Sequence, residues 1–190
     1  MRRNHVIAIV VIVLILLVGA VAAILALTLR SGPIAIRIEP ENVGRLTVGD
    51  TFTVNVTVEN CVNVFAVQVD LRYDPTVLNA TTTVEGPFLP SVRQTMLLMN
   101  ERARANNDTS PRTAGVYFVD SLIYSGNGTD ANGNGVLITI TFKVIGEGST
   151  ELQLFPYKPA ENTAGGTYFE DRNLNAIIPE LHNGSYGGSP

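Results

Sequence analysis

The chain of 190 residues is poor in the side chains that build catalytic and metal sites. It has one cysteine, two histidines and no tryptophan. A single cysteine, Cys61, excludes a disulfide within the chain, so we expect a small buried thiol and a fold that is stable from its own core. The histidines, His5 and His182, offer neither a helical pair for zinc nor a convincing partner for a serine or cysteine nucleophile. We therefore expect a protein that is not an enzyme and has no resident cofactor.

Carboxylates are more plentiful, but their spacing singles out no catalytic pair. Glu85, Asp120, Glu170 and Asp171 are the acidic residues that could serve a glycosidase. The part of the chain after residue 30 is only large enough for one domain, which leaves little material for a substrate cleft. Catalysis on a sugar is therefore disfavoured.

Positive charge is scarce outside the first 30 residues. Residues 31–190 hold ten of the 13 basic residues and all 17 acidic ones, a formal charge of −7. Nucleic-acid phosphates require a basic footprint. This balance argues against a nucleic-acid partner.

One long apolar run is present, at residues 6–27, and it contains no charged residue. At about 1.5 Å per residue such a helix spans about 30 Å, the thickness of the hydrocarbon core of a bilayer. Residues 1–30 are therefore expected to form an N-terminal transmembrane signal anchor. The prediction is a single-pass protein of the cell membrane.

The flanking arginines predict the orientation of this anchor. Arg2 and Arg3 precede the run and Arg30 follows it, so the positive-inside rule leaves the N-terminus in the cytoplasm and residues 31–190 extracellular. Ala20-Val21-Ala22 is also a small-x-small site of the kind that signal peptidase cuts. Cleavage after Ala22 is the alternative to a retained anchor.

After Pro33 the apolar period changes to two, which is typical of half-buried β-strands. Strands are expected near residues 34–38, 51–58, 66–73 and 136–144. Clusters of Gly, Asn, Asp and Pro separate them, as turns do. We expect an all-β fold, an antiparallel β-sandwich of the jelly-roll type over residues 31–187, preceded by the transmembrane helix and followed by a tail at 188–190. For the segment 91–113 the sequence allows either a short helix or a strand.

The sequence around residues 68–78 resembles the cohesin domain, the β-sandwich module that binds dockerins in cellulosomes. Its alternating strand ends in Tyr-Asp-Pro-x-Val-Leu, from Tyr73 to Leu78, and Val48-Gly49-Asp50 precedes it in the order seen in cohesins. The run from Gly135 to Val144 follows in the same order. The resemblance covers roughly residues 34–187, and it implies a surface module with a scaffolding or adhesion role.

The resemblance implies binding through a flat sheet face rather than a pocket. At Ala66 and Gln68 this chain lacks the polar pair, Asn and Asp, of cellulosomal cohesins. Outward alternation on the strand at residues 66–73 places Gln68, Asp70 and Arg72 on the candidate partner-binding face. The resemblance extends this face to Asp120 and Leu122, on a strand expected around residues 116–124, and to Leu137, Thr139 and Thr141. Leu122 and Leu137 would be its apolar anchors. The partner is expected to be an extracellular protein, dockerin-like or another surface protein.

Two other functions remain open. The cohesin sandwich is similar in architecture to carbohydrate-binding modules, and a polysaccharide could stack on a tyrosine platform of Tyr124, Tyr157, Tyr168 and Tyr186. The chain could also self-associate as a surface-layer or filament subunit by lending a strand to a neighbour's sheet edge.

Two motifs bear on metal and modification. Asp130-x-Asn132-x-Asn134-Gly135 matches the first half of a calcium loop, but Thr141 stands where a bidentate Glu is needed, so a hairpin loop is favoured over a calcium site. Candidate glycosylation sites are the Asn-x-Ser/Thr sequons at Asn55, Asn79, Asn107, Asn127 and Asn183.

Overall fold

The structure is a computed structural model that describes residues 32–106, 113–123, 128–159 and 165–188. The expected transmembrane anchor at residues 1–30, with the cleavage position at Ala22, lies outside these ranges. Within them, no helix is long and apolar enough to cross a bilayer. The residues from 33 onward are described here as a unit by themselves.

Two sheets account for the strands of the described residues. The first sheet runs in the order β12 (Glu180–His182), β1 (Ala35–Glu39), β3 (Thr51–Val64), β8 (Ala131–Val144) and β5 (Leu78–Glu85). The second runs in the order β11 (Ala176–Ile177), β10 (Tyr168–Glu170), β4 (Ala66–Tyr73), β9 (Thr150–Leu154), β13 (Gly184–Tyr186) and β2 (Asn42–Val43). On its other side β4 pairs with β7 (Thr113–Leu122), which pairs in turn with β6 (Thr95–Asn106).

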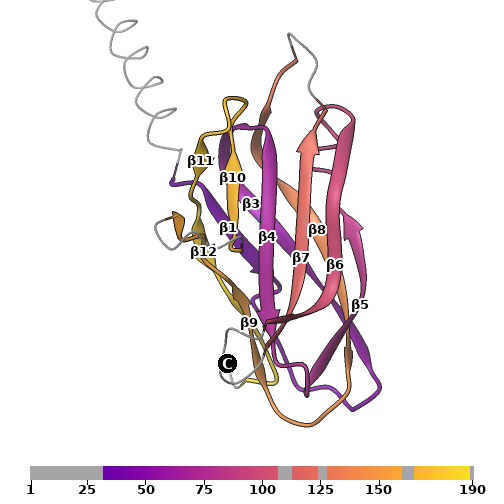
Figure 1. Ribbon diagram of the computed structural model, residues 1–190. Helices are drawn as coiled ribbons and strands as arrows, with labels where there is room; N and C mark the ends of the chain where they lie inside the picture. Colours follow the sequence, from indigo (N-terminus) through magenta and orange to yellow (C-terminus); the bar gives the residue numbers. More distant parts are fainter. Residues whose placement is uncertain (1–31, 107–112, 124–127, 160–164, 189–190) are drawn as a thin grey trace, which may run out of the picture. The chain divides into compact units, whose positions relative to one another are not determined.

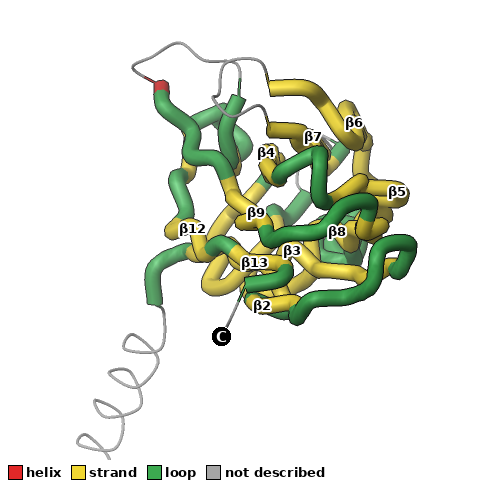
Figure 2. Tube along the Cα trace, turned by 90° about the horizontal axis from the view of Figure 1, so that it is seen from below, coloured by secondary structure: helices red, strands yellow, loops and turns green. Residues whose placement is uncertain are grey.

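The two sheets form the layers of a sandwich, with β4, β7 and β6 in one layer and β3, β8 and β5 in the other (Figures 1 and 2). Val54, Val56, Ile138 and Ile140 fill the space between them and are at most 1% exposed. Burying each such side chain contributes about 1.5–3 kcal/mol. The period of two therefore predicted these strands correctly, and the all-β sandwich is confirmed.

The glycine-rich and asparagine-rich stretch before residue 136 is part of β8, so the hairpin loop expected there is wrong. Asn132 Oδ1 accepts a hydrogen bond of 2.9 Å from the Asn63 backbone, and Asn134 Oδ1 accepts one of 2.8 Å from that of Asn60. Asn60 and Asn63 have positive φ angles of 54° and 55° and lie where the β3–β8 register shifts. The stretch thus pairs with two bulges of the neighbouring strand.

Most of the segment 91–113, for which the sequence allowed either a helix or a strand, forms the long strand β6. Its register against β7 shifts between Leu97 and Met99, and again between Glu101 and Arg104. Each shift is a bulge that interrupts the period of two. This is why alternation gave no clear prediction there.

The strands closest to the two ends of the unit pair with one another. β1 pairs in parallel with β12, and β2 pairs in parallel with β13. Ser185 Oγ donates a hydrogen bond of 2.5 Å to Asn42 Oδ1, across 143 positions of sequence. Both sheets are therefore completed by residues that come last in the domain.

Candidate protein-binding face

The outer side of the second sheet carries two rows of side chains that run across β10, β4, β7 and β6. The registers of these four strands place the rows. The first row is Tyr168, Gln68, Val119 and Met99. The second row is Glu170, Ala66, Ser121 and Met96. We call these eight residues the two-row patch.

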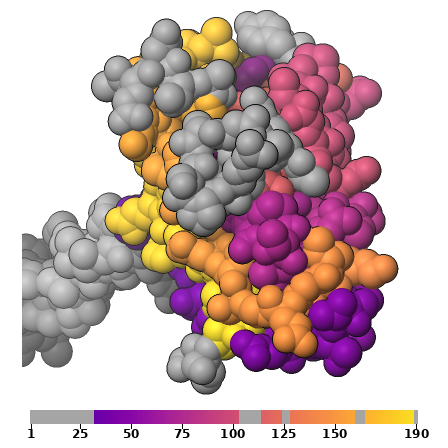
Figure 3. All heavy atoms as spheres, turned by 60° about the horizontal axis from the view of Figure 1, so that its bottom comes forward, coloured from indigo at the N-terminus to yellow at the C-terminus, as the bar shows by residue number. Residues whose placement is uncertain are grey.

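The β6 side of the two-row patch is apolar and exposed. Met96 and Met99 are 51% and 43% exposed, and Leu97 and Leu98 between them are 44% and 55% exposed. The bulge at Leu98 and the position of β6 at the sheet edge bring four successive apolar side chains to the surface. Figure 3 shows this stretch of chain, in pink, along one side of the surface. Apolar side chains gathered in this way mark interaction sites.

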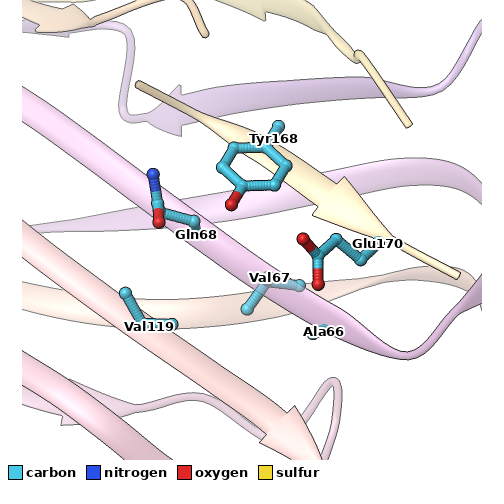
Figure 4. Close-up of a pocket in the computed structure, with 6 residues that line it drawn as sticks. All are labelled: Ala66, Val67, Gln68, Val119, Tyr168 and Glu170. Carbon is cyan, nitrogen blue, oxygen red and sulfur yellow. The ribbon is translucent and has the colours of Figure 1, made fainter. Parts of the chain in front are cut away.

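The β4 side of the two-row patch holds a hollow of about 30 Å³ (Figure 4). Gln68, Val119, Tyr168 and Glu170 surround it, and Gln68 Nε2 donates a hydrogen bond of 2.8 Å to the Gly166 carbonyl. Burial and the adjacent Glu170 carboxylate raise the pKa of Tyr168. Such a hollow holds one or two water molecules and is too small for a sugar ring. The patch therefore offers a surface rather than a pocket.

Further along β4, the residues expected to be exposed are covered. Asp70 and Arg72 are each 4% exposed, and Arg72 Nη2 lies 3.2 Å from Asp70 Oδ2. The Arg72 guanidinium stacks 3.3 Å from the ring centre of Phe155, and Asp70 Oδ2 accepts a hydrogen bond of 3.3 Å from the Gly166 backbone. Gln68, at 9%, is nearly as buried. The expectation that these three side chains are exposed is wrong, because the chain after β9 packs over them.

Asp120 and Leu122 point into the sandwich and are 1% exposed, so their expected outward direction is also wrong. Both lie on the same side of β7 as the fully buried Phe118, because side chains two positions apart on a strand point the same way. Burial, then a hydrogen bond and repulsion from Glu85, raise the pKa of Asp120 to about 7. Glu85 Oε1 also accepts a hydrogen bond of 2.7 Å from Thr95. The two carboxyl groups do meet, on the inner side of β7 rather than on the exposed face.

The remaining three residues of the expected face lie on β8, in the first sheet. Leu137 is 2% exposed, because the β3–β8 register shifts beside it and changes the alternation. Thr139 and Thr141 are half-buried, and Thr139 Oγ1 donates a hydrogen bond of 2.7 Å to Asn55 Oδ1. The eight expected residues therefore do not share one face.

The calcium motif is occupied by protein groups. Asp130 Oδ1 accepts hydrogen bonds of 3.2 Å from Arg93 and 2.7 Å from Arg172. The oxygens of Asn132 and Asn134 are taken by backbone donors. Among the residues that the structure describes, no three His, Cys, Asp or Glu side chains converge on a point where a metal could bind.

The tyrosine platform is not assembled by its described members. Tyr186 is 1% exposed and its hydroxyl bonds to Leu46, while Tyr157 and Tyr168 stack on each other with ring centres 4.2 Å apart. Tyr124 lies outside the described residues.

Fold and surface together define a β-sandwich that presents an exposed sheet face. The family model for the cohesin domain matches residues 36–184, and the chain belongs to this family. Cohesins are a family of binding modules and not of enzymes. No curated protein sequence matches the chain.

Solved cohesin structures share the fold at low sequence identity. A non-cellulosomal cohesin from Archaeoglobus fulgidus is 18% identical, with 82% of this chain and 90% of that one covered and a TM-score of 0.54. A type II cohesin from the cellulosome of Acetivibrio cellulolyticus is also 18% identical, with 82% and 96% covered and a TM-score of 0.56. A type I cohesin–dockerin complex from Clostridium thermocellum is 15% identical, with 81% and 92% covered and a TM-score of 0.55.

Proposed function

We propose that this chain binds a protein partner of the dockerin type on the two-row patch. The observation that carries the proposal is the exposed apolar edge of a rigid sheet, at Met96 to Met99, next to the Gln68 hollow. Cohesin relatives have been solved in complex with dockerins, which supports a protein as the partner. The face would bind by surface complementarity around a small apolar centre.

The covered end of the sheet supports this choice of surface. The chain after β9 packs over Asp70 and Arg72, which form an ion pair with each other. Arg72 also stacks on Phe155, and Asp70 accepts a hydrogen bond from the Gly166 backbone. A partner would have to displace these contacts to reach them. The β6 side of the two-row patch requires no such displacement, since Met96 and Met99 are already half exposed.

Export and membrane attachment are part of the same proposal. The apolar run at residues 6–27 and the arginines around it favour a tethered module whose sandwich lies outside the cell. Protease added to intact cells should then remove the sandwich and leave the anchor in the membrane fraction. Protection of the sandwich until the cells are lysed would contradict the export.

Affinity capture tests the partner. The full chain in detergent serves as bait for surface proteins of its source, and the prey is identified by mass spectrometry. The expected prey carries a duplicated Asp- and Asn-rich calcium-loop helix, and its binding is lost when calcium is removed from the prey. Recovery of the bait alone favours self-assembly, and retention on soluble polysaccharide without any protein favours a carbohydrate-binding module.

Matched variants test the surface. Met96→Asp and Met99→Asp each place a charge in the proposed apolar contact, and we expect affinity for the captured partner to fall at least about tenfold, or about 1.4 kcal/mol. Val48→Asp is the control, because Val48 is equally exposed, at 52%, but lies in the connection before β3. Equal affinities for all three variants would show that the partner binds elsewhere.

A further inference from the structure

The three sequons within the described residues differ in how their asparagine side chains are used. Asn55 is half-buried on β3, where its Oδ1 accepts the Thr139 hydroxyl at 2.7 Å. Asn183 is half-buried between β12 and β13, where its Oδ1 accepts the Leu154 backbone at 2.9 Å and its Nδ2 donates to Glu151 at 2.7 Å. Asn107 and Asn127 lie outside the described residues. The amides of Asn55 and Asn183 thus already have structural roles.

Asn79 is different from both. It lies near the start of β5, is exposed, and no hydrogen bond holds its side chain in the part of the chain that the structure describes. Leu78 and Ala80 on either side are 1% and 5% exposed and point into the core. The Ala80 backbone donates a hydrogen bond of 3.3 Å to the Tyr73 hydroxyl. The backbone at this sequon is therefore fixed, with Asn79 directed outward from the first sheet.

The surroundings of Asn79 leave room for a large substituent. β5 is the last strand of the first sheet and pairs only with β8 among the described strands. The residue across the ladder from Asn79 is Lys143, which is itself exposed. A bulky hydrophilic group at a sheet edge also covers backbone groups that would otherwise pair with another chain.

We propose that Asn79 is a glycosylation site and carries an N-linked glycan. The proposal rests on the export proposed above. An oligosaccharyltransferase would join Asn79 Nδ2 to C1 of a sugar carried by a polyprenyl phosphate or diphosphate. The bond between C1 and the phosphate oxygen breaks, and the polyprenyl phosphate or diphosphate that carried the sugar leaves with the electron pair. The displaced Nδ2 proton passes to solvent through a base of the transferase.

The position of the glycan fits the proposed binding surface. Asn79 projects from the outer side of the first sheet, whereas the two-row patch lies on the outer side of the second. A glycan there leaves Met96 and Met99 accessible to a partner. Asn183 instead holds β9 through Leu154, so a sugar on its Nδ2 would disturb a contact that the fold uses.

Peptide mass spectrometry on the full chain from its own source tests the proposal. Trypsin cleavage after Arg72 and Arg93 releases residues 73–93, in which Asn79 is the only asparagine. We expect this peptide to carry a glycan mass and its unmodified form to be lost. Recovery of residues 73–93 only in the unmodified form would overturn the proposal. The result does not depend on partner capture, so it stands or falls separately from the proposed function.

Two neighbouring substitutions provide the matched control. Thr81→Val removes the sequon, and Thr82→Val leaves it intact, although both threonines are exposed on β5. We expect the glycan on residues 73–93 to disappear in the first variant and to remain in the second. A modification that persists in Thr81→Val, or disappears in both variants, would contradict N-glycosylation at Asn79.

Discussion

Replacing the buried carboxyl group of Asp120 with an amide should remove a pH dependence of stability. The pKa of Asp120 is raised from 3.8 to about 7, chiefly by burial and then by Glu85. The folded protein therefore holds this proton more tightly than the unfolded chain. The stabilisation is complete below pH 3.8, and it is lost as the pH rises through about 7.

The size of the effect follows from the shift. A change of one pKa unit corresponds to 1.36 kcal/mol, so a shift of about three units sets an upper value of about 4 kcal/mol. Because Asp120 shares its site with Glu85, we expect the unfolding free energy of the unmodified chain, relative to that of Asp120→Asn, to fall by about 2–4 kcal/mol between pH 4 and pH 8. Asp120→Asn should be more stable than the unmodified chain at pH 8.

Urea unfolding followed by far-ultraviolet circular dichroism is the assay, since the chain has no tryptophan to report by fluorescence. All other carboxyl groups are common to both proteins, so the difference between their pH profiles isolates this site. Glu85→Gln removes the repulsion but keeps the burial, and its profile should fall between the two. Parallel profiles for Asp120→Asn and the unmodified chain would refute the reasoning.

Two further predictions concern close packing and the lone thiol. Gly86→Ala would place a Cβ 2.2 Å from the Val136 carbonyl oxygen, and we expect a loss of about 2–4 kcal/mol in urea unfolding. Gly44→Ala meets nothing within 4 Å and should change stability by less than about 0.5 kcal/mol, so equal losses would contradict the packing argument. Burial raises the pKa of Cys61 from 9.0 to about 12. Alkylation of the native thiol at pH 8 should therefore be at least about 100-fold slower than in denaturant, and equal rates would show that it is accessible.

The period of two was sufficient to predict the core strands but not the direction of every side chain. Val67 and Val69 alternate without interruption, and both are buried in the core as expected. At Leu137 a register shift between β3 and β8 breaks the alternation. Strict alternation along the sequence therefore places this side chain on the outer side of the sheet, although it is buried. At Asp120 the outward direction implied by the resemblance is wrong, and nothing in the sequence indicates that this side chain is buried beside Glu85.

The candidate site was harder to predict than the fold for a different reason. Phe155 and Gly166 cover Asp70 and Arg72. They lie in a stretch whose apolar residues follow neither the period of a strand nor that of a helix. Long-range contacts of this kind leave no local signal. The apolar residues Met96 to Met99 were visible in the sequence, but bulges in β6 hid their strand and so their place at the sheet edge.

The pairing of β1 with β12 and of β2 with β13 has a consequence for biosynthesis. Strands made at the beginning of the domain wait for partners that are made about 140 residues later, as the Leu46–Tyr186 and Asn42–Ser185 hydrogen bonds show. A nascent chain therefore cannot close either sheet until its residues 180–186 have left the ribosome. Such non-local pairing makes folding slow. A chain that ends before residue 180 would leave β1 without β12 and β2 without β13.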